Sequence, residues 1–178
     1  MLWLGVLLWA GSGLAQEEAA VEDPKRSAEE QAQREEVKQV WEAYMEAYRR
    51  GDYEEAARGA ERERELLAAL VGEEHADYAT SLNNLAMFYQ SKGSYEQALP
   101  LHQQAVEIRR NALGEDHPHY ATSLNNLAKQ YTTMGSYEQA LPLYQQAMEI
   151  RRTALGEDHP DYAQSLNSLA ILYKDMGS

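Results

Sequence analysis

A segment of 42 residues returns along this chain, and this repetition constrains the fold more than any single residue does. The segment that begins at Val71 returns at Leu113 and begins again at Leu155. Between the first two copies 30 of 42 positions are identical, and 17 of the 24 residues from Leu155 to Ser178 match the second copy. Repetition this close predicts an array of similar units that stack on one another.

Each complete copy contains two helical patterns separated by a glycine. The apolar stripe of the first pattern, at spacings of three and four residues, consists of Leu82, Leu85, Ala86 and Tyr89. The stripe of the second pattern, which starts near Tyr95, consists of Ala98, Leu101, His102, Ala105 and Ile108. Gly93 lies between them, where a residue without a Cβ atom can take the left-handed conformation that ends a helix. Each unit is therefore predicted to be a helical hairpin.

The loop between units carries the signals that begin a helix. In the second copy Asp116 or His117 can cap the following helix, and Pro118 stands near its first position. The small residues Ala86 and Ala128 predict that the two helices of a pair cross closely, so that a larger side chain there would overpack the contact.

Composition excludes several classes of function. Acidic residues number 29 against 16 Lys and Arg, and the formal charge of −13 argues against nucleic acid or anionic lipid as a partner. The absence of cysteine excludes disulfides, thiolate zinc sites and thiol nucleophiles. The sequence shows no convergent catalytic groups and no glycine-rich phosphate loop, so we predict neither a catalytic residue nor a cofactor, and we do not expect an enzyme.

Three histidines, His75, His117 and His159, recur once in each copy beside acidic residues. A zinc site needs its ligands about 2 Å from one point, whereas neighbouring layers of packed helices are about 10 Å apart. We therefore expect no metal site, and we interpret these histidines as caps or loop-packing residues.

Two arginine pairs close the second helices, Arg109 with Arg110 and Arg151 with Arg152. Two interpretations are open, a ladder of acid-binding groups on the outer face or ordinary solvated helix ends. The surrounding negative charge favours solvated ends.

The N-terminal segment is predicted to be an export signal. The stretch from Met1 to Ala15 has no charged side chain, is short for a membrane span, and ends in small residues that suit cleavage before Gln16. The protein is therefore expected in the periplasm or outside the cell, with no membrane insertion after cleavage. One alternative is an uncleaved anchor. The other is a wrongly assigned start codon, in which case the protein would be cytoplasmic. The acid-rich residues 16–36 are predicted to form a disordered linker whose end merges into a helix.

The repeated motif resembles the tetratricopeptide repeat in its 42-residue kinesin light chain-like form. The matching residues are Leu82-Asn-Asn-Leu-Ala-Met-Phe-Tyr, Gly93-Ser-Tyr-Glu-Gln-Ala-Leu-Pro-Leu and Ala105-Val-Glu-Ile-Arg-Arg. On this resemblance residues 71–112 and 113–154 are complete units, and residues 155–178 supply only a first helix. Residues 37–70 resemble a degenerate earlier unit through Gly51-Asp-Tyr-Glu-Glu-Ala, and the phase of its first helix is left open.

The resemblance implies an all-α superhelix, a solenoid of stacked antiparallel helix pairs in which the first helix of each pair lines a concave groove. It implies a protein–protein interaction scaffold that binds a peptide or protein partner in this groove. The residues expected to face the groove, in three equivalent sets, are Thr80, Asn83, Asn84, Met87, Gln90, Thr122, Asn125, Asn126, Lys129, Thr132, Gln164, Asn167, Ser168, Ile171 and Lys174. Asn83, Asn125 and Asn167 are interpreted as a row of amides for a peptide backbone, as bridges between neighbouring helices, or as residues simply copied by duplication.

A second function stays open beside the scaffold, a regulatory or sensing array that belongs to a larger multidomain enzyme. Repeats of the family that this sequence resembles are often attached to catalytic domains. Ser178 falls where the earlier copies continue into a second helix, so either the lone helix serves as a cap or the reading frame is a fragment. Without that second helix, the face formed by Leu166, Leu169, Ala170 and Tyr173 is expected to be exposed.

Overall fold

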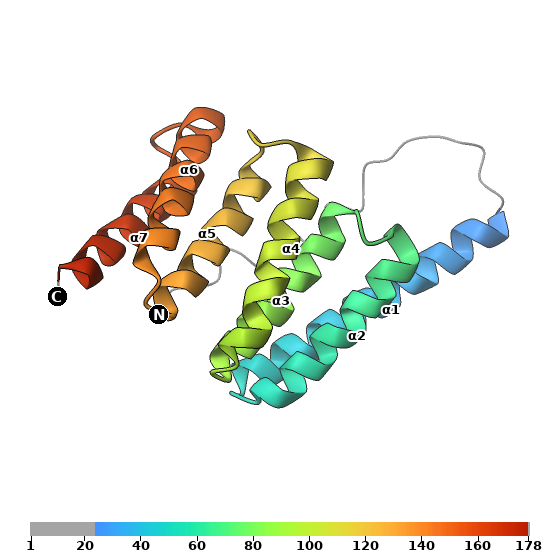
Figure 1. The fold of residues 1–178 in the computed structure, drawn as a ribbon. Coiled ribbons are helices and arrows are strands. Elements are labelled where there is room, and N and C mark those ends of the chain that lie inside the picture. Colours follow the sequence, from blue (N-terminus) through green and yellow to red (C-terminus); the bar gives the residue numbers. More distant parts are fainter. Residues whose placement is uncertain (1–23, 178) are drawn as a thin grey trace.

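The computed structural model describes residues 24–177, which fold into seven helices with no strand among them. The helices are α1 (Pro24–Arg49), α2 (Tyr53–Val71), α3 (Ala76–Ser91), α4 (Tyr95–Leu113), α5 (Pro118–Thr133), α6 (Tyr137–Leu155) and α7 (Pro160–Met176). Short loops join them, and they lie in a row from α1 at one end to α7 at the other (Figure 1). None of the helices in this part of the chain has the length and apolarity that a membrane span requires.

The helices pack in chain order, each against the next. In addition, α3 contacts α5 and α5 contacts α7, so the first helices of successive pairs also touch one another. This arrangement is the stack of helix pairs that the 42-residue period predicts, because one hairpin alone cannot cover its apolar stripe. The predicted all-α solenoid is confirmed.

Helix starts repeat the same local chemistry in each unit. His75, His117 and His159 are the N-caps of α3, α5 and α7, and each ring nitrogen Nδ1 accepts a hydrogen bond from the backbone N–H two residues later, at 3.1–3.2 Å. Of the two cap candidates in the second copy, His117 is the one used. The backbone bends back after the first helix at Gly93, whose φ of +77° would strain any residue with a Cβ atom.

The first helix begins earlier than the sequence suggests. Residues 24–36, which were expected to belong to a disordered linker, form the first half of α1. Alanine, glutamate and glutamine are good helix formers, an ion pair between Glu30 and Arg34 spans one turn, and Glu36 pairs with Arg62 of α2. The predicted signal peptide and residues 16–23 lie outside the residues that the structure describes.

Apolar contacts inside the pairs repeat with the same period. Leu82 of α3 packs in a buried cluster with Ala105 and Ile108 of α4. One period later, Leu124 packs in the same way with Ala147 and Ile150 of α6.

The first pair exchanges a small and a large residue at its helix crossing. Tyr44 of α1 stands 42 residues before the small Ala86, and Gly59 of α2 stands 42 residues before the large Leu101. A Cβ atom at Gly59 would lie 2.4 Å from the Cβ atom of Tyr44. The large residue of the crossing thus lies on the first helix and the small one on the second, the reverse of the next unit. Tyr44 corresponds to Ala86, which gives the phase of α1 relative to the later first helices.

Replacing Ala128 with leucine is expected to lower the free energy of unfolding by about 1–3 kcal/mol, because Ala128 is fully buried at the crossing of α5 with α6. The matched control is Ala170→Leu, at the same position of α7, where the side chain is exposed and the change should stay within about 0.5 kcal/mol. Urea unfolding measures both. Equal losses in the two variants would contradict the crossing.

Candidate functional site

The residues predicted to face a groove differ widely in exposure. Those exposed are Lys129, Asn167, Ile171 and Lys174. Those buried are Asn83 and Asn125. The remaining residues, Thr80, Asn84, Met87, Gln90, Asn126, Thr122, Thr132, Gln164 and Ser168, are half-buried. The set therefore does not form one continuous exposed surface.

Asn83 is a bridge between helices. Its Nδ2 donates to Ser123 Oγ of α5 at 3.0 Å, and its Oδ1 accepts from His102 Nδ1 of α4 at 2.8 Å. With both ends of the amide bonded and 6% of the residue exposed, it has nothing left for a peptide. The hypothesis of an amide row is wrong for Asn83, and the alternative of a helix-bridging role holds.

The other two asparagines differ from Asn83 because their surroundings differ. Asn125 is also buried, but Tyr144 stands where His102 stands in the preceding unit, and its hydroxyl bonds to Thr132. Within residues 24–177, Asn125 Oδ1 has no hydrogen-bond partner. Asn167 is exposed on α7. Three copies of one residue thus occupy three environments, so they do not act as a row.

Arg109 connects two successive helix pairs. From α4, its Nη2 donates to Thr80 Oγ1 of α3 at 2.8 Å. Its Nη1 donates to the carbonyl of His119 at 2.9 Å and to Ser123 Oγ of α5 at 3.1 Å. The guanidinium is buried, and burial lowers the pKa of Arg109 to about 10. Its hydrogen bonds go to neutral oxygens on both neighbouring helices.

Arg151 repeats this connection one unit later. Its Nη2 donates to Thr122 Oγ1 of α5 at 3.3 Å, and its Nη1 donates to Ser165 Oγ and to the carbonyl of Asp161 on α7, at 3.0 and 3.1 Å. The interpretation of these arginines as solvated helix ends is wrong for Arg109 and Arg151, because 6% and 2% of these residues are exposed. It holds for Arg110 and Arg152, which are exposed and pair with glutamates on their own helices.

The sequence contained one signal of this connection, because the arginine and both of its side-chain partners are the same in successive copies. Arg109, Thr80 and Ser123 recur 42 residues later as Arg151, Thr122 and Ser165. Sequence spacing alone did not connect them, because a helix-end arginine next to a second arginine also suits a solvated surface.

A buried carboxyl group joins the first three helices. Glu63 of α2 is 2% exposed, and its Oε2 accepts a hydrogen bond of 2.7 Å from the hydroxyl of Tyr44 on α1. The same hydroxyl accepts from Asn84 Nδ2 of α3 at 3.1 Å. Burial raises the pKa of Glu63 from 4.5 to about 7; Asp77 also raises it, while the bonds from Tyr44 and Asn84 partly oppose the rise. The folded state therefore favours the protonated acid.

This shift has a defined effect on stability. Because the folded pKa of Glu63 lies above the unfolded one, its contribution is complete below pH 4.5 and is lost as the pH rises to about 7. Glu63→Gln removes that loss, so the free energy of unfolding of the variant should rise relative to the parent protein by up to about 3 kcal/mol across this interval. Urea unfolding at several pH values checks it. A difference that does not change with pH would contradict the burial of an acid at this position.

The titration of His102 changes stability with pH in the opposite direction, and the comparison of the variant with the parent protein cancels it. Burial, aided by Lys129, lowers the pKa of His102 from 6.5 to about 4. Its contribution is complete above pH 6.5 and is lost as the pH falls toward 4. Both proteins carry His102, so the difference between them reports Glu63.

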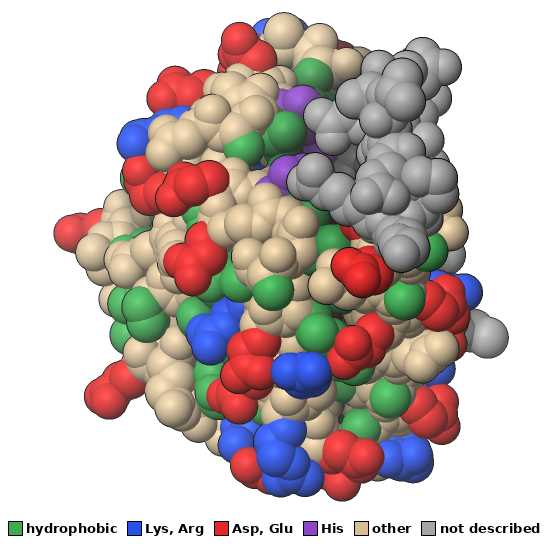
Figure 2. Space-filling view, turned by 90° about the vertical axis from the view of Figure 1, so that its right-hand side faces the viewer, with side chains coloured by type: hydrophobic (Ala, Val, Ile, Leu, Met, Phe, Trp, Pro, Cys, Tyr) green, Lys and Arg blue, Asp and Glu red, His purple; other side chains and the backbone are tan. Residues whose placement is uncertain are grey.

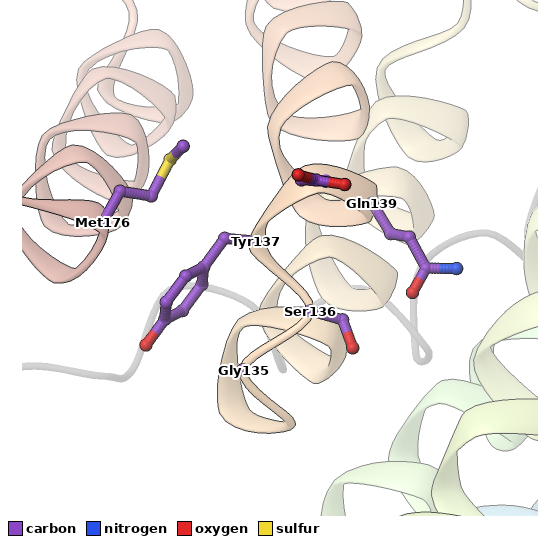
Figure 3. A pocket seen from close by; sticks show the side chains of 6 residues that line it. Gly135, Ser136, Tyr137, Gln139 and Met176 are labelled. Carbon is purple, nitrogen blue, oxygen red and sulfur yellow. The ribbon is translucent and has the colours of Figure 1, made fainter.

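One shallow cavity of about 500 Å³ lies between the start of α6 and the end of α7. It is lined by Gly135, Ser136, Tyr137, Glu138, Gln139 and Met176. The ring of Tyr137 extends toward the side of α7 and Met176, whereas Gln139 points to the other side (Figure 3). Glu138 is the single carboxylate of this lining.

Across residues 24–177, no three His, Asp or Glu side chains gather closely enough to hold a metal ion. His75, His117 and His159 each use a ring nitrogen to cap a helix.

One position on the first helices varies between copies and is exposed in two of the three. Met87, Lys129 and Ile171 stand 42 residues apart in copies that are otherwise close to identical. Met87 is half-buried against the first pair, while Lys129 and Ile171 are exposed, Ile171 to 50%. The next position also varies, as Phe88, Gln130 and Leu172, but it is fully buried in each copy, so exposure rather than variation alone distinguishes Lys129 and Ile171.

The sequence matches the tetratricopeptide repeat family over residues 77–153 and 126–178, and the chain belongs to this family. Members of the family are generally protein-interaction modules. No curated protein matches the sequence.

Two solved structures show the same arrangement of repeats. A putative kinesin light chain of Podospora anserina with nearly identical repeats of this type is 27% identical, with a TM-score of 0.72, over 80% of this chain and 67% of that one. BtubC (BKLC) of P. vanneervenii is 28% identical, with a TM-score of 0.68, over 76% of this chain and 54% of that one. The chain therefore spans about half the length of BtubC. These likenesses confirm the kinesin light chain-like form of the repeat.

Proposed function

We propose that this chain is a scaffold that binds a peptide or protein partner on the surface formed by its first helices α3, α5 and α7. The observation that carries the proposal is the position of Met87, Lys129 and Ile171, which varies between copies and becomes exposed where packing does not use it. Membership of a family of protein-interaction modules supports the same function.

The chemistry of this surface differs from the amide row that the sequence suggested. Its exposed groups on α5 and α7 are the ammonium groups of Lys129 and Lys174, the aliphatic side chain of Ile171 and the amide of Asn167. Cationic groups beside an apolar one suit a partner segment that combines acidic and aliphatic residues. The buried Asn83 and Asn125 contribute to this surface only by fixing the helices that carry it.

A selection of binders from a random-peptide phage library, followed by affinity measurement on a variant, tests this function. Peptides selected on the parent chain should bind at least about tenfold more weakly to the double variant Lys129→Glu, Ile171→Asp. The variant removes a cationic and an aliphatic contact, and its new carboxylates repel the acidic residues of the peptide. Both residues are exposed, so the variant should unfold as the parent does.

The matched control places new charge on the second helices instead. Gln104→Glu with Gln145→Glu changes exposed residues of α4 and α6. Selected peptides should bind this control with unchanged affinity. Peptides that lose affinity for the control and keep it for the first variant would place the binding surface on the second helices and refute the proposal.

We also propose that the protein acts after export, with the segment from Met1 to Ala15 removed. Mass spectrometry of the protein purified from its source should give a chain that begins at Gln16. A chain that retains Met1 in the cytoplasmic fraction would refute this.

A further inference from the structure

A lysine at the end of α3 joins the first two units through a ring and a carboxylate. Lys92 is the C-cap of α3, and its Nζ lies over the ring of Tyr89, 5.9 Å from the centroid. The same ammonium group pairs with Glu54 at the start of α2. An aromatic face and a carboxylate both attract a cation, so together they form a site for an ammonium group. At this junction the chain fills the site with its own lysine.

The next junction, between α4 and α5, keeps the ring and the carboxylate but not the lysine. The equivalent residues, 42 positions later, are Tyr131 for the ring, Glu96 for the carboxylate and Met134 for the lysine. Met134 is the C-cap of α5 and is 41% exposed. Glu96 is exposed in the first turn of α4, and within residues 24–177 its carboxylate forms no ion pair. This junction therefore presents both attracting groups without a cation.

The ring is held by the same position of the preceding second helix at both junctions. The hydroxyl of Tyr89 donates to Glu61 of α2, and the hydroxyl of Tyr131 accepts from Gln103 Nε2 of α4 at 3.2 Å. Gln103 stands 42 residues after Glu61. The match places the ring of Tyr131 relative to Met134 as the ring of Tyr89 lies relative to its lysine.

A buried amide distinguishes the α4–α5 junction from the others. Gln130 is fully buried at a position where the other copies have Phe88 and Leu172. Its Nε2 donates to the carbonyl of Tyr95 at 3.1 Å, and this bond ties the last turns of α5 to the residue before Glu96. Its Oε1 has no hydrogen-bond partner in the described part of the chain. Because buried acceptors are rarely left without a donor, this oxygen is a further acceptor for a group that binds here.

The α4–α5 junction is internal to the array, with α3 packed on one side and α6 on the other. The corresponding junction of the third unit is bounded by α7, the last described helix. On α7, Leu166, Ala170 and Tyr173 are exposed as expected, whereas Leu169 is buried against the preceding unit. The groups around Glu96 depend on none of these residues.

Charge favours a basic partner at this junction. On the face shown in Figure 2, the right-hand side of Figure 1, acidic and basic side chains lie close to one another wherever grey atoms do not cover the surface. Ion pairs such as Arg62 with Glu36 join α1 and α2. The whole chain has 29 acidic residues against 16 Lys and Arg, so acids are left over, and Glu96 is one of them. An unpaired carboxylate beside an aromatic ring complements a cationic group of a partner.

We propose that Glu96, Tyr131 and Met134 form a site for one lysine side chain of a partner protein. The ammonium group pairs with Glu96 over the ring of Tyr131, and the aliphatic stem lies along the thioether of Met134. The occupant is a lysine because Lys92 fills the equivalent place one unit earlier. The site is separate from the surface around Lys129 and does not rest on the function proposed for that surface.

Nuclear magnetic resonance of the full chain tests this site. An acetylated tetralysine peptide is added to the isotope-labelled protein at physiological salt, which screens long-range attraction. The backbone amide signals of Glu96 and Met134 should shift along one saturable curve. They should shift more than the signals of the exposed loop acids Glu115 and Glu157. A tetraglutamine peptide, which has no charge, should move none of these signals.

Three variants separate the site from general attraction between opposite charges. Glu96→Gln should weaken the binding of tetralysine by roughly threefold or more, because it removes the carboxylate that pairs with the ammonium group. Glu115→Gln removes the same charge from an exposed loop and should leave the affinity unchanged. Met134→Lys should abolish the shift at Glu96, because the chain then supplies the cation itself. All three changes fall on exposed residues, so the circular dichroism spectra should match that of the parent protein.

Three results would overturn the proposal. The first is the absence of a shift at Glu96 and Met134, or shifts spread over the acidic residues without preference for Glu96. The second is equal weakening of tetralysine by Glu96→Gln and Glu115→Gln, which would show that net charge alone attracts the peptide. The third is undiminished binding of tetralysine at Glu96 in Met134→Lys.

Discussion

Replacing Arg109 with alanine is expected to lower the free energy of unfolding by about 3–5 kcal/mol. The change removes the hydrogen bonds that the guanidinium donates to Thr80 Oγ1, Ser123 Oγ and the carbonyl of His119, and a hydrogen bond from a charged group contributes about 1.5–3 kcal/mol. It also opens a cavity where the side chain lay. The variant no longer carries the desolvation cost of a buried cation. This gain offsets part of the loss, so the total stays below the sum of the three hydrogen-bond contributions. Denaturant unfolding measures the change.

The neighbouring residue supplies the control for this prediction. Arg110 is exposed and pairs with Glu107 on its own helix, so Arg110→Ala should change stability by no more than about 0.5 kcal/mol. The two variants remove the same side chain one residue apart. Similar losses from both would show that Arg109 is solvated and that its bonds to two helix pairs do not exist in solution.

Replacing Gly59 with leucine, the residue at the same position of the next unit, should destabilise the chain by more than about 3 kcal/mol. Glycine inside a helix ordinarily costs about 1 kcal/mol relative to alanine, so propensity alone predicts a gain. The contact with Tyr44 reverses the sign, because a Cβ atom at Gly59 would lie 2.4 Å from the Cβ atom of Tyr44 and overpacking follows. Thermal or urea unfolding of the variant measures this loss.

A double variant separates this clash from any other effect of leucine. Tyr44→Ala combined with Gly59→Leu recreates the pairing of Ala86 with Leu101 found one unit later. It should recover stability relative to Gly59→Leu alone, although the bond from Tyr44 to Glu63 is lost. Double-variant losses equal to the sum of the single losses would contradict the exchange of small and large residues.

The helix pairs could be predicted from the sequence because their signals are local. A glycine that takes positive φ, a histidine that caps and a stripe with helical spacing each act within a few residues, and the 42-residue period repeats them. The closeness of the crossing at Ala128 followed from residue size alone, and the alanine is fully buried. The length of α1 was missed because it depends on an ion pair to α2 as well as on composition.

The polar contacts could not be predicted because they join residues from three helices. Arg109 meets Thr80 and Ser123, which lie 29 residues before it and 14 after it, and nothing local marks this meeting. Asn83 looked exposed because an amide on a first helix suits a groove, yet His102 and Ser123 enclose it. Lys129 and Ile171 were among the candidates because they stand beside the packing stripe of a first helix, and both are exposed.

The most direct test of the stacked array is a double-mutant cycle between Arg109 of α4 and Ser123 of α5. These side chains belong to successive helix pairs and meet at 3.1 Å. If each second helix is bonded to the pair that follows it, the unfolding free energies of Arg109→Ala, Ser123→Ala and the double variant should show a coupling of more than about 0.5 kcal/mol. Losses that add to within about 0.3 kcal/mol would contradict the arginine connection between units.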